Sequence, residues 1–419
     1  MTRLASLLIP LVAWGAAAIS LSTSAGCKTA MDCSLGGKCV EGRCQCYPIW
    51  QGTKCEVLAI GEASNASTNG YRNPNGASWG GSAIRADDGS YHMFVSFISQ
   101  DCGLKNWKLN SVIHHAVSEN PDGPYSFREE VLSEFAHNPT ITRAPDGTYL
   151  LYHIGETLSA DERSLYLRDC RKGRRAEPKR SASSGGPANF DGRIRIAFSK
   201  SLDGPWSLLN NGTPIIQPRR GSYWDTAVTN PAPLILKNGS VFLYYRGDDR
   251  FHPDFDGQRH RKIGAFFAQS WTGPYHRIRD TAITPSGEDP VVFANSDGSG
   301  YHMLFENKFN GIVGQHAFSV DGKFWRTVED PAYDLLASWD GGSSTRLQRR
   351  ERPQLLLDER GEPLYLFNAV QGSRDRGEGR SAGQSTWTMA APLGFRFPTA
   401  SGTPPRHPEI EAPGSWHPV

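Results

Sequence analysis

The chain has 419 residues, more than one small domain needs, so we expect at least two folding units. Its 38% hydrophobic and 21% charged residues are typical of a soluble globular protein, and its 44 glycines and 28 prolines favour a fold rich in tight turns. The formal net charge of +2 lacks the concentrated basic excess of nucleic-acid binders, so we expect no nucleic-acid partner.

Residues 1–25 have the pattern of a secretory signal peptide. Arg3 supplies a positive start, an apolar segment follows, and Thr23 and Ala25 place small residues before a cleavage site. An uncleaved membrane anchor and a bacterial lipoprotein signal at Cys27 are the alternatives. The small residues favour cleavage, and Ser24 stands where lipoprotein signals have leucine. We therefore expect a secreted, extracellular protein with no membrane span after cleavage.

Six cysteines are concentrated in residues 27–55. So dense a cluster behind an export signal is typical of a disulfide framework, and spacing alone leaves fifteen connectivities open. Zinc is the alternative, but this segment contains no histidine and no Cys-x-x-Cys pair. Outside it, Cys102 and Cys170 most simply pair with each other; a catalytic thiol is the alternative.

The cysteine segment resembles an EGF-like module. The resemblance rests on the close "CQC" pair and on the tail "YPIWQGTKC", which contains Trp50 and Gly52. It implies the disulfides Cys27–Cys39, Cys33–Cys44 and Cys46–Cys55. The acidic residues that calcium-binding EGF modules place before their first cysteine are absent, so we expect no calcium in this module.

From residue 76 onward one template repeats five times. A strand, a glycine turn and an aromatic-rich strand recur in "WGGSAIRADDGSY", "HNPTITRAPDGTY", "TNPAPLILKNGSV", "EDPVVFANSDGSG" and "ERPQLLLDERGEP". Each unit continues with a third strand, and four of them end in a second signature such as "SKSLDGPW" or "SENPDGPY". Repeats of about four strands and roughly 60 residues predict an all-β, five-bladed β-propeller over residues 56–397. A β-sandwich, the alternative, does not explain five columns in register.

Two insertions and a tail interrupt this pattern. Residues 168–187 are basic and rich in serine and glycine, which predicts a solvated loop; contact with an acidic polysaccharide is the alternative. Residues 248–260 extend the third blade, and residues 398–419 have the composition of a tail. Three glycosylation sequons begin at Asn65, Asn211 and Asn238.

In a propeller, the start of the first strand and the end of the second strand of each blade share one face. Reading both columns predicts a ligand funnel at that face. The residues expected to bind substrate there are Trp79, His137, Asn138, His153, Asn230, Arg246, Asn307 and Arg352. Tryptophan faces stack on sugar rings, and Asn, His and Arg side chains bind hydroxyl groups, so we expect an extracellular poly- or oligosaccharide as partner.

Hydrolysis of a glycosidic bond needs a proton-donating carboxylic acid and a second carboxylate. The candidates for this catalytic pair are Asp225, Asp248, Glu288, Asp289, Glu306 and Glu351. A structural ion pair between the adjacent Glu351 and Arg352 is the alternative for these two residues. For Asp289, the alternative is a turn cap before the following proline.

Residues 76–395 resemble the five-bladed propeller glycoside hydrolases of family 43 and its relatives, families 62 and 32. The resemblance rests on blade starts such as "EDPVVF" and on the "S-x-S-x-D-G-P-[YW]" blade ends. It implies an aspartate base in the first blade, a second aspartate that tunes pKa values, and a glutamate acid. Here the first blade has "SWGGSAI" instead, and only the fourth blade keeps the aspartate, as Asp289. We expect no cofactor and no catalytic metal; calcium in the channel, as in some relatives, stays open.

Two functions follow from these observations. The first is a secreted glycosidase that acts on extracellular or cell-wall polysaccharide. The second is a propeller that binds glycans or proteins without catalysis, with the EGF-like module as spacer or adhesion element.

Overall fold

The computed structural model describes residues 26–172, 192–249, 260–372 and 385–394. The expected signal peptide, most of the basic insertion, most of the third-blade insertion and the tail lie outside these residues. No helix among the described residues is long and apolar enough to cross a membrane.

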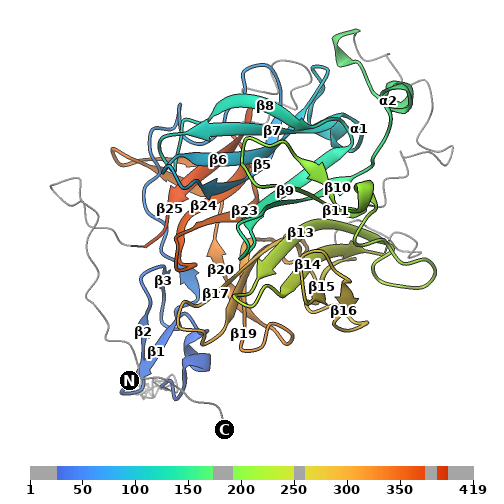
Figure 1. Cartoon of the computed structure of the whole chain (residues 1–419). Helices are drawn as coiled ribbons and strands as arrows, with labels where there is room; N and C mark the ends of the chain where they lie inside the picture. The colour runs from blue at the N-terminus through green and yellow to red at the C-terminus, as the bar shows by residue number, and fades with distance from the viewer. Residues whose placement is uncertain (1–25, 173–191, 250–259, 373–384, 395–419) are drawn as a thin grey trace, which may run out of the picture.

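The large domain is a five-bladed β-propeller, as the repeat predicts (Figure 1). Blades 1 to 4 each have four antiparallel strands, numbered outward from the innermost. These are β5 (Ser78–Arg85), β6 (Tyr91–Ile98), β7 (Ser111–Ser118) and β8 (Ser126–Leu132); β9 (Ala136–Arg143), β10 (Tyr149–Gly155), β11 (Ile194–Ser199) and β12 (Ser207–Leu208); β13 (Ala227–Ile235), β14 (Val241–Asp248), β15 (Arg261–Ala268) and β16 (His276–Arg277); and β17 (Glu288–Ala294), β18 (Tyr301–Asn307), β19 (Ile312–Ser319) and β20 (Arg326–Tyr333).

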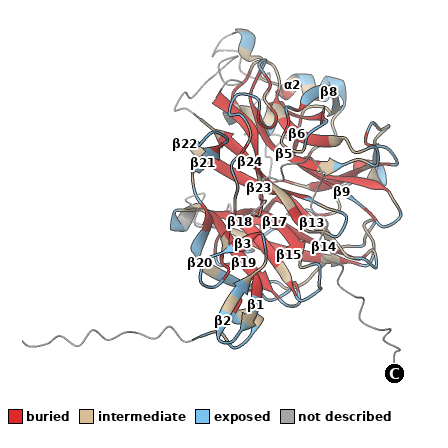
Figure 2. Cartoon of the chain, turned by 90° about the vertical axis from the view of Figure 1, so that its left-hand side faces the viewer, coloured by how far each residue is buried: buried red, intermediate tan, exposed pale blue. Residues whose placement is uncertain are grey.

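Blade 5 consists of three strands, and short elements surround the five sheets. Its strands are β23 (Arg349–Leu357), β24 (Pro363–Gln371) and β25 (Thr386–Pro392). The hairpin of β21 (Leu336–Trp339) and β22 (Ser343–Arg346) precedes them. The short helices α1 (Trp107–Asn110) and α2 (Ala160–Tyr166) stand between strands of blades 1 and 2. The inner strands are buried, whereas β22 is exposed (Figure 2).

The innermost strands form a closed ring around the propeller axis. Each contacts the next one along the chain, and β23 contacts β5. In every blade a β-bulge interrupts the pairing of the innermost strand with its neighbour. The residues with left-handed backbone at these bulges are Gly80, Asn138, Asn230, Asp289 and Arg352. All five blades therefore share one backbone geometry near the axis, although only one of these residues is glycine.

The segment before blade 1 completes the edge of blade 5. Backbone hydrogen bonds join Tyr71 N to Thr388 O at 3.0 Å and Thr388 N to Tyr71 O at 3.1 Å. The side chain of Asn69 donates to Ala390 O and accepts from Ala390 N, both at 2.9 Å. A sheet edge left open exposes unpaired backbone groups. This pairing covers the outer edge of blade 5 with a segment that precedes blade 1.

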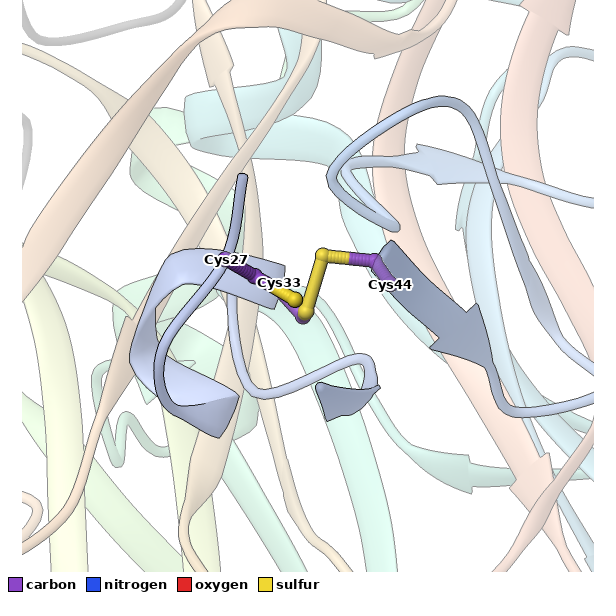
Figure 3. A group of neighbouring side chains, drawn as sticks. All are labelled: Cys27, Cys33 and Cys44. Carbon is purple, nitrogen blue, oxygen red and sulfur yellow. A yellow bond between two sulfur atoms is a disulfide. The ribbon is translucent and has the colours of Figure 1, made fainter. Parts of the chain in front are cut away.

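The N-terminal module, residues 26–58, contains the helical turn η1 (Ala30–Cys33) and strands β1 (Gly37–Val40), β2 (Arg43–Cys46), β3 (Trp50–Gln51) and β4 (Val57–Leu58). Its disulfides have the pairing that the EGF-like resemblance implies: Cys27–Cys39, Cys33–Cys44 and Cys46–Cys55. Figure 3 shows the bond between Cys33 and Cys44 with Cys27 beside it.

No cysteine among the described residues is free, and Cys102 is bonded to Cys170 as expected. The alternatives of a zinc site and of a catalytic thiol are therefore wrong, because both require thiolates.

One aromatic ring from each of blades 1 to 4 packs on the second strand of the preceding blade. Each of these rings lies immediately before the outermost strand of its blade. The pairs are Tyr125 with Phe367, Trp206 with Phe94, Tyr275 with Tyr152, and Trp325 with Tyr244.

In blade 5 the N-terminal module supplies the corresponding ring. Trp50 stacks on His316 of blade 4 with 4.3 Å between ring centroids and lies 5.0 Å from His302. Trp50 and Leu58 share one apolar cluster with Phe293 of blade 4. The module is therefore built into the propeller, and its interpretation as a spacer is corrected.

We predict that Trp50→Ala destabilises the whole propeller. The change leaves a cavity between the module and blade 4, and such truncations cost about 3–5 kcal/mol. Urea unfolding followed by circular dichroism measures the effect. The control is Val40→Ala, at an exposed position of the same module. Equal unfolding midpoints for the two variants would show that the module packs without stabilising the propeller.

Candidate functional site

The two predicted columns meet at one end of the propeller. Glu288, at the start of β17, pairs across the strands with Glu306 near the end of β18. Thr229 in β13 likewise pairs with Arg246 near the end of β14. The start of the first strand and the end of the second therefore share a face in these blades, and we call it the axial end.

The bulge residues bring side chains from different blades into contact at the axis. Arg352 of blade 5 donates a hydrogen bond to Asn138 Oδ1 of blade 2, although the two blades are not neighbours. Asn230 of blade 3 donates to Asp289 Oδ1 of blade 4. Arg352 Nε lies 4.0 Å from Asp289 Oδ1, so one connected network spans four blades. Asp289 is thus a partner in the channel rather than a turn cap.

Gly80 makes room for Arg352. A Cβ atom at position 80 would lie 2.8 Å from Arg352 Nε and 3.0 Å from its Cδ and Cζ. The guanidinium therefore occupies the space where blade 1 would otherwise direct a side chain. This is the physical counterpart of the missing first-blade aspartate in the sequence.

Three carboxylates come close together beside the bulge residues of the axial end. Asp289, Glu306 and Glu351 each have an oxygen within 4.8 Å of the others. Lys308 bridges two of them: its Nζ lies 2.9 Å from Glu351 Oε1 and 3.2 Å from Glu306 Oε2. The same ammonium lies 3.4 Å from Glu288 Oε1, so it contacts three glutamates.

Glu288 is the most heavily paired of these acids. Arg246 Nη1 donates to its Oε2 at 2.8 Å, and Arg261 Nη1 donates to its Oε1. Arg246 also donates to Asp248 Oδ2 at 3.0 Å. Burial alone would raise the pKa of Glu288, but its cationic neighbours lower it to about 2. Glu288 is therefore an ionised, structural member of the network.

Glu306 and Glu351 have pKa values shifted in opposite directions. Burial, and next the negative charge of Glu351, raises the pKa of Glu306 well above its usual range. Burial would also raise the pKa of Glu351, but hydrogen bonds from Arg349 and the charge of Lys308 lower it. Burial and the charge of Glu288 raise the pKa of Asp289 to about 6. The site thus holds neighbouring carboxyl groups whose surroundings shift their pKa values in opposite directions.

The ion-pair alternative for Glu351 needs a correction. Its salt-bridge partners are Arg349, through two hydrogen bonds of 2.7 Å, and Lys308. Arg352, the residue next to it, instead pairs with Asn138 and approaches Asp289. The bulge separates the directions of the two adjacent side chains.

The cluster of Asp289, Glu306 and Glu351 does not fit a calcium ion in this arrangement. Its oxygens are of the type that calcium prefers. The ammonium of Lys308, however, already contacts Glu306 and Glu351 at salt-bridge distance, so a positive charge of the chain itself stands beside them.

Three further predicted substrate-binding residues, His137, Trp79 and His153, have different surroundings. His137 Nδ1 is 2.7 Å from Ser111 Oγ, and Arg352 Nη1 lies 3.5 Å from its Nε2. Arg349 covers the ring of Trp79, with 4.3 Å from Cζ to the ring centroid. His153 Nε2 is buried with no hydrogen-bond partner among the described residues, and burial lowers its pKa to about 3.

Asn307 uses both ends of its amide within the protein. Its Nδ2 donates to Gln315 Oε1 at 2.6 Å, and its Oδ1 accepts from Ser286 Oγ at 3.0 Å. Its expected role in substrate binding therefore stays a prediction.

The structure does not bring Asp225 to the carboxylate cluster. Asp225 is fully buried and is paired with Arg219 and Arg277, and its Oδ2 accepts from the hydroxyl of Tyr245 at 2.7 Å. Side chains alternate along a strand, so Tyr245 and Arg246 lie on opposite faces of β14. Asp225 thus belongs to a structural ion network on the other side of that sheet.

Three cations of the site are absent from the sequence-based candidates: Arg261, Lys308 and Arg349. Each lies within two residues of a strand end or start that faces the axial end. Lys308 directly follows Asn307, and Arg349 precedes Glu351 by two residues. Extending the comparison of strand starts and strand ends by two positions would therefore have included Lys308 and Arg349.

Comparison with solved structures places the fold. The chain is similar to a family 117 glycoside hydrolase from the marine bacterium Zobellia galactanivorans, with 14% identity, a TM-score of 0.50, and coverage of 81% of this chain and 89% of that one. It is also similar to the catalytic domain of a family 62 α-L-arabinofuranosidase from Coprinopsis cinerea, with 12% identity, a TM-score of 0.50, and coverage of 80% and 94%. A Dyadobacter fermentans protein of unknown function shares 13% identity with a TM-score of 0.51, over 78% of this chain and 98% of that one.

No protein-family model matches the sequence, and no curated protein matches it significantly. The likeness therefore concerns the fold. The large domain is a five-bladed propeller of the kind found in glycoside hydrolases, which confirms the architecture expected from the repeat.

We predict that Glu288→Gln destabilises the protein by about 3–5 kcal/mol, because it leaves Arg246 buried with one anionic partner fewer. Thermal unfolding at neutral pH measures the change. Glu359→Gln is the matched control, since that glutamate pairs with Arg85 in an exposed salt bridge. A loss no larger than the control's would mean that the network does not depend on Glu288.

Proposed function

We propose that this protein binds a carbohydrate at the axial end and hydrolyses a glycosidic bond, with Glu306 as the proton donor. One observation carries the proposal: Glu306 and Glu351 lie side by side with pKa values shifted in opposite directions. Two carboxyl groups whose environments separate their pKa values are the arrangement that acid and base roles require. The glycoside hydrolase-like fold supports carbohydrate as the ligand class.

In this proposal the chain's own residues divide the work. Glu306, whose pKa burial raises, donates its proton to the leaving oxygen. Glu351, held ionised by Arg349 and Lys308, acts as the partner carboxylate. Lys308 contacts both groups, so it couples their charges and positions them.

We also propose that the protein is secreted. The four disulfides support this, because such bonds persist in oxidising compartments. Asn65, Asn211 and Asn238 are all exposed, as glycosylation of the three sequons requires.

Glu306→Gln tests the catalytic role. Wild-type protein is screened against aryl-glycosides and plant or algal polysaccharides, and the variant is measured on the substrates found. We expect kcat to fall by roughly 10²–10⁴-fold while binding persists, since an amide cannot donate the proton. Glu329→Gln, at an exposed position of β20, is the control. Unchanged kcat in Glu306→Gln would exclude Glu306 as the acid.

The pH profile provides an independent prediction. Activity requires protonated Glu306 and ionised Glu351, so the rate falls as pH rises through the raised pKa of Glu306 and as pH drops through the lowered pKa of Glu351. Residual activity of Glu306→Gln lacks the alkaline decline. If the variant keeps that decline, another group titrates there.

Binding without hydrolysis is the second candidate function. It is favoured by the ion pairs that hold Glu288 and Glu351, and by Arg352 in the space beside Gly80. Retention on a glycan array together with inert wild-type protein across the substrate screen would establish it.

A further inference from the structure

We propose that the sugar bound at the axial end carries an anionic group, a uronate carboxylate or a sulfate ester, and that Arg349 is its principal contact. This inference rests on the proposed carbohydrate site and adds the chemical class of its ligand. It depends on which charged groups of the network can reach an incoming ligand.

Among the described residues, the network contains five cationic and five acidic side chains, at different depths. The cations are Arg246, Arg261, Lys308, Arg349 and Arg352, and the acids are Asp248, Glu288, Asp289, Glu306 and Glu351. Every acidic side chain is between 4% and 7% exposed. Three cationic ones are far more exposed: Arg261 at 26%, Lys308 at 29% and Arg349 at 40%. An approaching ligand therefore meets ammonium and guanidinium groups above buried acids.

Burial and the charge of Glu351 also raise the pKa of Glu306, which favours the uncharged form of one of the acids. This shift acts in the same direction as the difference in exposure, because it leaves the accessible cations less fully balanced by the acids beneath them.

Arg349 is preorganised for such a contact. Its Nε and Nη2 donate to the two oxygens of Glu351, each at 2.7 Å, which fixes the guanidinium plane. The ring of Trp79 lies against one face of the guanidinium, with 4.3 Å from Cζ to the ring centroid. A planar guanidinium held in this way binds carboxylate and sulfate oxygens with directional, charge-assisted hydrogen bonds.

Calorimetric titration of the Glu306→Gln protein tests the inference without consuming the ligand. One arm compares oligogalacturonates with their methyl esters, and the other compares sulfated galactan oligosaccharides with their desulfated counterparts. We expect at least tenfold tighter binding of the anionic member of one pair, and weakening of that binding as salt rises. The arm that responds identifies the anionic group. Equal affinities within both pairs would overturn the inference.

Variants of Arg349 test the assigned contact. Arg349→Gln is expected to weaken binding of the anionic ligand by about tenfold or more, and to weaken binding of the neutral counterpart by less. Arg349→Lys keeps the positive charge but loses the bidentate guanidinium, so its affinity for the anionic ligand should lie between those of wild type and Arg349→Gln. It replaces Arg349→Gln in the test if that variant folds poorly. Arg326→Gln, at an exposed position of β20, is the control. Equal weakening for anionic and neutral ligands would refute the role of Arg349.

These outcomes separate the two proposals. If an anionic oligosaccharide binds but wild-type protein never cleaves it, the proposal of hydrolysis is wrong and the proposed ligand class is supported. If neutral oligosaccharides bind equally well and are cleaved, the proposed ligand class is wrong and hydrolysis is supported.

Discussion

In each innermost strand a bulge places one residue in left-handed backbone, and in blades 2 to 5 its side chain meets side chains of other blades at the propeller axis. Because five such positions meet there, the identity of one residue limits the others. Gly80 leaves a space, Arg352 fills it, and its charge in turn requires Asn138 and Asp289 as partners. The axial chemistry of the protein follows from this shared constraint.

Burial of so many charges makes the network cooperative. A buried carboxylate is costly unless it is paired, and three of the cations here each pair with more than one acid. Lys308 contacts three glutamates, and Arg246 contacts Asp248 and Glu288. The same burial that strengthens the ion pairs also raises the pKa of Glu306, so structural and chemical roles are not separable at this end of the molecule.

The opposite requirement governs the rim of the propeller, where apolar rings must cover each blade. Blade 5 ends one strand early, and the chain covers the gap from its other end. Trp50 packs on blade 4, while Asn69 and Tyr71 pair with β25. Three disulfides hold the module that presents Trp50, and so they contribute to closure of a fold whose sheets contain none of them.

The sequence by itself determined the five blades, because turn glycines and alternating strands repeat at fixed spacing, and it determined the cysteine framework through a recognisable pattern. It also brought Glu288, Asp289, Glu306 and Glu351 to one end of the propeller, since strand order settles that placement. Which acid pairs with which cation was decided only by the tertiary structure. In the sequence Asp225 resembles the other acidic candidates, but in the structure it lies on the opposite side of the sheet from Arg246. The sequence likewise does not distinguish Arg349 from an ordinary surface arginine, although its side chain covers Trp79. Pairing of this kind depends on side chains that meet from different blades, and local sequence carries no record of those distances.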